Sequence, residues 1–253
     1  MTDTSSLDRR MFIAAVAALG VPGAARATTL DELIALNTRA RGGMKRLARL
    51  RTMDAVLRIS EPGFTAIGTY AADRSGRVRV DVFMSGKRAF SEGVDGDGVW
   101  GWPGDKPGPA PAGEKGREAL LHGIAFNLTP LYALPAEGHR LDLIGADPPC
   151  IQLTFADGFE TRLFLDRVTG QVVRRQDRRA YHPDVDSTEK RIESRFSDFR
   201  ATDGVVSPWS SADYDLGSGD RIGHTGILRL AWDRDLSARI PRAAAAVAPP
   251  EAG

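Results

Sequence analysis

The sequence predicts a mainly β protein with one curved antiparallel sheet of about ten strands and two helical segments. Polar and apolar residues alternate over many short segments, as in strands with one buried and one solvated face. Turn-forming residues separate these segments at intervals of roughly ten residues, which favours a single sheet over two domains. Two other segments show the apolar spacing of helices.

The composition is that of an ordinary folded protein. Of 253 residues, 42% are hydrophobic and 26% charged, with 34 Lys and Arg against 33 Asp and Glu. This balance is too apolar for a disordered chain and lacks the basic excess that holds nucleic acid. A lone cysteine, Cys150, makes no internal disulfide and no thiolate metal site. No uncharged apolar stretch is long enough for a membrane helix in the mature chain.

Residues 1–27 have the features of an export signal. Arg9 and Arg10 precede a weakly hydrophobic Ala-rich run, and Ala25-Arg26-Ala27 resembles a cleavage site. The arginine pair is typical of a twin-arginine signal. An amphipathic helix of the mature protein is the alternative. We expect cleavage after Ala27 and a free periplasmic protein, because no cysteine near that site could carry a lipid anchor.

The first predicted helix opens a domain over residues 28–240. Thr29 and Glu32 have capping-box spacing, and the helix is expected to end at Gly42-Gly43. Its apolar stripe consists of Leu30, Leu33, Ile34 and Leu36.

From Thr52 the period changes to two, which predicts a meander of antiparallel strands. Glu61-Pro62-Gly63 and Asp95-Gly96-Asp97-Gly98 are turn signals within it. The predicted strands cover residues 52–60, 64–70, 77–84, 88–94 and 99–102.

A loop and a helix interrupt the strands. Residues 103–113 contain four Pro and three Gly and are expected to form no regular structure. Residues 114–132 have a helical pattern.

Strands resume in the second half of the chain, each set off by turn residues. The segment 226–232 is a last strand or a turn, and residues 241–253 are an Ala/Pro tail expected to be disordered. The other strands are expected at 140–144, 150–155, 160–165, 172–178, 189–200 and 205–215.

A search for catalytic motifs gives no positive case for an enzyme. The sequence has no metal-binding histidine spacing, nucleophile elbow, phosphate loop or dinucleotide fingerprint. His182, Asp184 and Asp186 could offer an imidazole and two carboxylates to a cation or a reaction, but a polar hairpin loop explains them better. We therefore expect no catalytic residues, no metal and no cofactor.

Two further patterns allow two interpretations each. The basic run Arg174, Arg175, Arg178 and Arg179 is either a docking patch for anionic partners or, as we favour, a solvated strand face. The tryptophans at positions 100 and 102 share one face of a strand and belong to the core or to a pocket wall.

Four motifs, in this order, resemble the periplasmic lipoprotein-sorting and carrier proteins of the LolA/LolB type. The resemblance runs from about Leu30 to Trp232. It rests on the glycine pair Gly42-Gly43, the strand 95–102 with Trp100, the turn Asp166-Arg167-Val168-Thr169-Gly170, and the segment 196–208, which contains Phe196-Ser197-Asp198-Phe199 and Asp203-Gly204.

The resemblance implies a half-open, unclosed antiparallel β-barrel with an apolar concave face and a helical lid. A concave face too large to fill itself could bury an acyl chain, which gains about 0.8 kcal/mol per CH₂. Candidate lining residues are Leu57, Ile59, Ile67, Val80, Val82, Trp100, Trp102, Leu120, Ile124, Phe126, Phe155 and Phe164.

The leading hypothesis is a monomeric periplasmic carrier that shuttles an acyl chain, lipid or lipoprotein between envelope sites, with transient membrane or envelope-protein partners and no nucleic acid. The alternative is a non-catalytic sensing or binding module of the same fold that acts through protein contacts at an exposed edge strand. In a further alternative, the same candidate lining residues fill the core of the protein and leave no cavity for a ligand.

Overall fold

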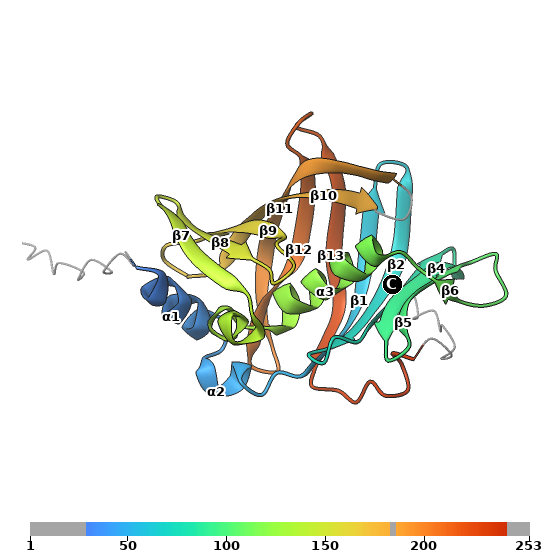
Figure 1. The fold of residues 1–253 in the computed structure, drawn as a ribbon, viewed down its shortest axis with the longest axis horizontal. Coiled ribbons are helices and arrows are strands. Elements are labelled where there is room, and N and C mark those ends of the chain that lie inside the picture. Colours follow the sequence, from blue (N-terminus) through green and yellow to red (C-terminus); the bar gives the residue numbers. More distant parts are fainter. Residues whose placement is uncertain (1–28, 183–185, 242–253) are drawn as a thin grey trace, which may run out of the picture.

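A computed structural model describes residues 29–182 and 186–241, and Figure 1 shows its fold. The predicted export signal, residues 1–27, lies outside the described residues, as does the predicted tail except for Pro241. The helices are α1 (Leu30–Ala40), α2 (Met44–Leu47), α3 (Glu114–Leu128) and the 3₁₀ helix η1 (Leu131–Glu137). The strands are β1 (Thr52–Glu61), β2 (Phe64–Asp73), β3 (Val78–Met84), β4 (Lys87–Asp95), β5 (Gly98–Pro103), β6 (Ala110–Pro111), β7 (Arg140–Ala146), β8 (Pro149–Thr154), β9 (Glu160–Leu165), β10 (Val172–His182), β11 (Asp186–Thr202), β12 (Val205–Asp215) and β13 (Arg221–Trp232).

The thirteen strands of the described residues form one antiparallel sheet in the order β6-β5-β4-β3-β2-β1-β13-β12-β11-β10-β9-β8-β7. The first and last long strands meet in the middle, where Met53 of β1 lies opposite Trp232 of β13. The edge strands β6 and β7 do not pair with each other, so the sheet stays open. The predicted half-open antiparallel barrel is confirmed.

The structure corrects the prediction at three places. There are thirteen strands rather than about ten, and the segment expected as a strand or turn at 226–232 belongs to β13, which begins at Arg221. The loop 103–113 is not wholly irregular, since Ala110–Pro111 pairs with β5 at the sheet edge, where proline is tolerated. The predicted helix 114–132 ends at Leu128, before Pro130 and η1.

Helix α3 lies across the concave face of the sheet (Figure 1). Its residues Ile124 and Leu128 belong to a buried cluster with residues of β1, β3 and β13, among them Met53, Val78 and Trp232. A second cluster joins α1, α3 and η1 to β7–β9 through Leu33, Ala125, Leu131, Leu134, Leu141, Ile151, Leu153, Phe155, Leu163 and Leu165. The helix therefore fills much of the space that the curved sheet encloses.

The outer face of the sheet has its own small apolar cluster. Leu236 and Ile240, from the segment that follows β13, pack against Ala71 of β2 and are almost fully buried. Arg79 and Asp81 form a buried ion pair of 2.9 Å on this face, and Ser91 donates a hydrogen bond of 2.5 Å to the same carboxylate. The end of the described chain thus covers a part of the outer face of the sheet, at β2.

The sheet curls so that the tip of β10 reaches β1. Nε2 of His182 lies 3.0 Å from Oε2 of Glu61, although β11, β12 and β13 separate the two strands in the sheet. His182 also faces Asp186 across the β10–β11 hairpin, which agrees with the hairpin interpretation, whereas Asp184 lies outside the described residues. Within the described residues no three His, Cys, Asp or Glu side chains gather as metal ligands.

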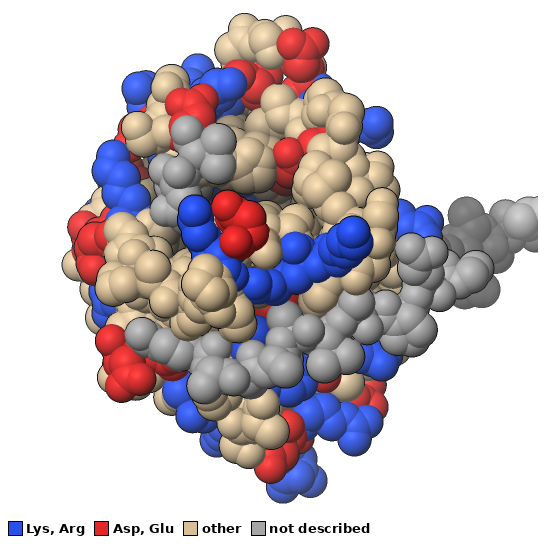
Figure 2. Space-filling view, turned by 90° about the vertical axis from the view of Figure 1, so that its right-hand side faces the viewer, with Lys and Arg blue, Asp and Glu red and all other residues tan. Residues whose placement is uncertain are grey.

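Charged groups are interspersed on the surface. On the face shown in Figure 2, Lys and Arg side chains form a row across the middle, and Asp, Glu and uncharged residues surround it. This mixture matches the near balance of 34 basic and 33 acidic residues in the chain.

Candidate functional site

The candidate site begins at α1. This helix and the residues that follow it contact two turns of the sheet, the β9–β10 turn and the β11–β12 turn. The sequence-predicted capping box starts the helix, with Thr29 and Glu32 bonded reciprocally. Near the other end, Nδ2 of Asn37 donates to the carbonyl of Gly170 at 2.8 Å, and Nε2 of Gln171 donates to the carbonyl of Ala40 at 3.1 Å. The Thr-Gly turn of the sequence motif therefore anchors the helix.

The first glycine of the pair after α1 has a steric reason. Gly42 has φ of +124°, and a Cβ there would lie 2.1 Å from the carbonyl oxygen of Gly204 in the β11–β12 turn. The backbone N–H of Val206 donates to the carbonyl of Arg41 at 3.0 Å. Only glycine allows this close approach, so two separated sequence motifs meet at the end of α1.

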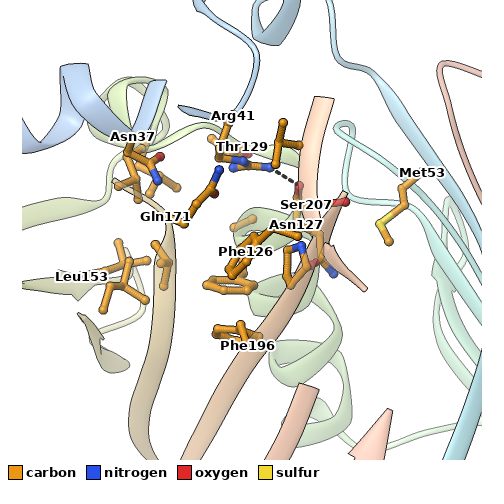
Figure 3. Close-up of a pocket in the computed structure, with 18 of the residues that line it drawn as sticks. Asn37, Arg41, Met53, Phe126, Asn127, Thr129, Leu153, Gln171, Phe196 and Ser207 are labelled. Atoms are coloured by element: carbon orange, nitrogen blue, oxygen red, sulfur yellow. Dashed lines mark hydrogen bonds between the residues drawn. The ribbon is translucent and has the colours of Figure 1, made fainter. Parts of the chain in front are cut away.

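A cavity of about 100 Å³ lies between α1, the C-terminal part of α3, η1 and the inner face of the sheet. Figure 3 shows Arg41, Thr129, Gln171 and Ser207 on one side, with Phe126 and Phe196 on the other. The apolar lining consists of Met53, Ala125, Phe126, Leu131, Leu134, Leu153, Leu163, Val172, Phe196, Phe199, Val206, Pro208, Ile227 and Trp232. The remaining lining residues are Asn37, Arg41, Asn127, Thr129, Gln171 and Ser207.

Arg41 brings a positive charge to this apolar cavity. Its Nη2 donates to the carbonyl oxygen of Asn127 in α3 at 3.3 Å, the dashed line in Figure 3. Desolvation by burial lowers the pKa of the Arg41 guanidinium to about 10, because burial disfavours the charged form. The group remains a cation at neutral pH in a poorly hydrated place.

Two polar atoms beside the cavity are buried without hydrogen-bond partners among the described residues. They are Oγ of Ser207 and Nε1 of Trp232, and both side chains line the cavity. Buried polar groups are nearly always paired in proteins. Their position marks a place where a bound molecule would find hydrogen-bonding groups.

The inner face beyond the cavity is charged. Arg175 lies opposite Leu163 of β9 and Ser194 of β11, and its guanidinium stands 4.9 Å from the centre of the Phe126 ring. Asp177 pairs with Arg175 and Arg179. Desolvation by burial lowers the pKa of Arg175 and raises the pKa of Tyr181. The prediction of a solvated basic face is therefore wrong for Arg175 and Arg179, which point inward.

A second, wider cavity of about 440 Å³ lies on the other side of α3. Its lining is more charged and includes Arg74, Arg117 and Glu137. His122 of α3 lies here, with Nε2 2.7 Å from Oδ2 of Asp157 in the β8–β9 turn. The His122 ring stacks on Phe159 at 4.5 Å between ring centres. This contact ties the middle of α3 to the sheet.

The structure divides the sequence-predicted lining residues between the two faces of the sheet. Phe126 lines the first cavity and Phe155, with Ile124, the second. Leu57, Val80, Leu120 and Ile124 belong to the apolar cluster under α3. By strand register Ile59 and Val82 share the inner face with Leu57.

The other candidates lie on the outer face, which corrects the prediction for them. Ile67 is paired with Arg58, and Trp100 is fully buried beside Arg79. Trp102 packs 3.7 Å from the Arg88 guanidinium and Phe164 4.3 Å from that of Arg174. Their strands place these side chains away from α3, because neighbours along a strand alternate between faces.

Sequence reasoning missed Arg41, Ser207 and the leucines of η1 and β9. For β9 the signal was Arg162, because a polar residue at this position shares the strand face of Phe164 and leaves Leu163 and Leu165 on the opposite face. Nothing in the local pattern indicated that Arg41 and Ser207 would line one cavity, because they are far apart in the sequence.

Comparison with known proteins shows a LolA-like fold. A DUF1329 family protein from Desulfovibrio piger has a similar structure, with a TM-score of 0.53 and 14% identity over 82% of this chain and 94% of that chain. A LolA superfamily protein from Nitrosomonas europaea has a TM-score of 0.50 and 14% identity over 85% of this chain and 97% of that chain. No family model and no curated protein matches the sequence.

The helices of residues 29–182 and 186–241 are too short or too polar to cross a membrane.

Proposed function

We propose that the protein is a non-enzymatic carrier of the bacterial envelope that holds an acyl chain or a similar apolar ligand between α3 and the inner face of the sheet. The apolar cavity beside α3, with its cationic and unpartnered polar groups, carries this proposal. The LolA-like fold of the Nitrosomonas protein supports it. The predicted export signal is consistent with a periplasmic location, where lipids and lipoproteins are available to a carrier.

Long chains require α3 to move. The cavity of about 100 Å³ is smaller than the ~150 Å³ cavity that takes up one benzene molecule in an engineered core. A ligand of many carbons must therefore displace apolar side chains of α3, and it regains about 0.8 kcal/mol for each CH₂ that it buries.

The way α3 is built is compatible with such a shift. Gly113 gives its first turn no side-chain cap, and Gly116 and Gly123 lie within the helix. Each interior glycine weakens a helix by roughly 0.5–1 kcal/mol relative to alanine. The proline-rich segment 103–113 connects the helix to β5, so α3 is held mainly by its packing on the sheet.

The direct test is organic extraction and mass spectrometry of the protein purified from a periplasm without detergent. A lipid or acyl chain recovered near one per protein supports the carrier. Recovery of none, together with no uptake of a fluorescent fatty acid, would contradict it and favour a module that senses protein partners.

A matched pair of variants links the ligand to the cavity. Ala125 lines both cavities and is 9% exposed, so Ala125→Leu should fill space there and reduce the recovered lipid. Ala136→Leu adds the same carbons at an exposed position of η1 and should leave recovery unchanged. Equal recovery from both variants would place the ligand elsewhere. Circular dichroism of each variant checks that it is folded.

A further inference from the structure

Arg41 is a cation whose charge no acidic side chain of residues 29–182 and 186–241 balances. Among the described residues its guanidinium makes one hydrogen bond, to the carbonyl oxygen of Asn127, and no ion pair with a carboxylate. The guanidinium has five N–H donors in a planar fork. Most of this donor capacity therefore has no partner among the described residues, and the Arg41 side chain lines the cavity.

The neighbouring amides are already engaged. Asn37 and Gln171 use their side-chain N–H groups to hold the carbonyls of Gly170 and Ala40. Ser207 differs, because its residue is only 8% exposed and its Oγ has no hydrogen-bond partner among the described residues. Arg41, Ser207 and the unpartnered Nε1–H of Trp232 are thus cavity groups with donors available to a ligand.

A carboxylate is the group that fits these donors. A guanidinium binds a carboxylate through two parallel N–H···O bonds, and a serine hydroxyl can donate a third. The small cavity admits a compact head group and its first carbons, and its phenylalanine and leucine lining suits an alkyl chain. An uncharged head group would take further water away from the half-buried Arg41 guanidinium without supplying a counter-ion, which is costly.

We propose that Arg41 and Ser207 bind the carboxylate of a single-chain fatty acid, whose alkyl chain extends from this point between α3 and the inner face of the sheet. This inference rests on the proposed carrier function and specifies the chemical class of its ligand. It makes the α1 end of the cavity a carboxylate-binding site.

The test compares two ligands that differ only in the head group. Hexadecanoate and hexadecan-1-ol are titrated at pH 8 into protein from which lipid has been removed, and binding is followed by displacement of a fluorescent probe. We expect the acid to bind between about tenfold and a hundredfold more tightly than the alcohol, the range for hydrogen bonds to charged groups.

Two variants assign the preference to the site. Arg41→Gln should remove most of the preference for the acid and leave the affinity for the alcohol unchanged. Ser207→Ala should reduce the preference by a smaller factor. Arg58→Gln is the control, because it removes the same charge from an exposed position on the outer face and should behave as the wild type.

The outcomes separate the two proposals. Equal affinity for acid and alcohol, or a preference that survives in Arg41→Gln, overturns the carboxylate site while the carrier function stands. Binding of neither ligand overturns the carrier function itself. If Arg41→Gln does not fold, the acid-to-alcohol ratio of Ser207→Ala decides, since an unchanged ratio counts against the site.

Discussion

At the scale of single residues, the close approach of Gly42 to Gly204 fixes where Arg41 lies. Gly42 has a φ of +124°, and a Cβ on this residue would come within 2.1 Å of the Gly204 carbonyl oxygen, so there is no room for a side chain. The end of α1 is consequently fixed against the β11–β12 turn. Arg41, the residue that ends α1, bonds to this turn through its backbone carbonyl and to α3 through its side chain.

Gly42→Ala is predicted to destabilise the protein by about 2–4 kcal/mol, because backbone strain of about 1–3 kcal/mol adds to a clash with backbone atoms. Urea unfolding measures the change. Gly63→Ala is the control, since Gly63 also has positive φ, +76°, but open space around its Cβ position. Equal losses in both variants would show that the contact with Gly204 contributes nothing.

Asp166 of the Asp-x-x-Thr-Gly turn carries a pH dependence. The backbone N–H of Thr169, its hydroxyl and the backbone N–H of Val168 all donate to Oδ1. These bonds, that of the Thr169 N–H above all, lower the pKa of the carboxyl below its ordinary value of 3.8. The charged form thus stabilises the fold at pH values above the unfolded pKa, and this stabilisation is lost as the pH falls through the folded pKa.

Asp166→Asn is therefore expected to lose roughly 0.5–1 kcal/mol at pH 7, since the turn is largely solvated. The difference from the wild type should shrink as the pH falls below about 4, where the carboxyl of the unfolded chain takes up its proton, and it should vanish once the pH has fallen through the lower pKa of the native carboxyl. Urea unfolding at several pH values checks this. A difference that stays constant from pH 7 to pH 3 would contradict the role of the charge.

At the scale of elements, α3 decides whether the concavity is filled. It packs on the sheet through Ile124 and Leu128, and His122 adds a bond to Asp157 and stacking on Phe159. The neighbouring Phe155 ring lies 4.3 Å from that of His122. A few contacts thus hold the helix at its middle and at its C-terminal end.

His122→Ala is predicted to weaken the attachment of α3 by about 1–2 kcal/mol, the sum expected for one aromatic contact and one hydrogen bond to a carboxylate. Amide hydrogen exchange in residues 114–128 should then quicken by roughly tenfold, with β1 and β13 unchanged. Arg117→Ala is the control, because it removes only an exposed pair with Glu114. Similar exchange rates in both variants would show that His122 does not help to attach α3 to the sheet.

At the scale of the whole molecule, the sheet separates the apolar clusters of its inner face from a smaller apolar cluster on its outer face. The inner face carries α3 and the cavities, whereas a part of the outer face is covered by the segment after β13, through Leu236 and Ile240. The curl of the sheet brings β10 to β1 at Glu61 without closing the barrel. Stability and ligand binding can therefore be changed separately.

Ile240→Ala is predicted to destabilise the fold by about 2–4 kcal/mol, because it leaves a cavity at a side chain that is 1% exposed. Ligand affinity of the folded protein should not change, since the site lies on the other face of the sheet. Urea unfolding and fatty-acid titration measure the two effects. Loss of affinity without loss of stability would contradict this separation.

The sequence by itself determined the local structure and its order along the chain. Period-two alternation, the capping box of α1 and the Asp-Gly turns depend on neighbouring residues, so the helices, most strands and one curved antiparallel sheet could be predicted, whereas the open form of the sheet was implied only by the resemblance to the LolA/LolB type. The LolA-like motifs were also visible because turn chemistry is local.

Only the tertiary structure decided which strand face meets α3. It placed Trp100, Trp102 and Phe164 on the outer face and Arg175 on the inner face. It alone brought Arg41 and Ser207 to one cavity, because a side chain's surroundings depend on the curl of the sheet and on contacts between residues far apart in the chain.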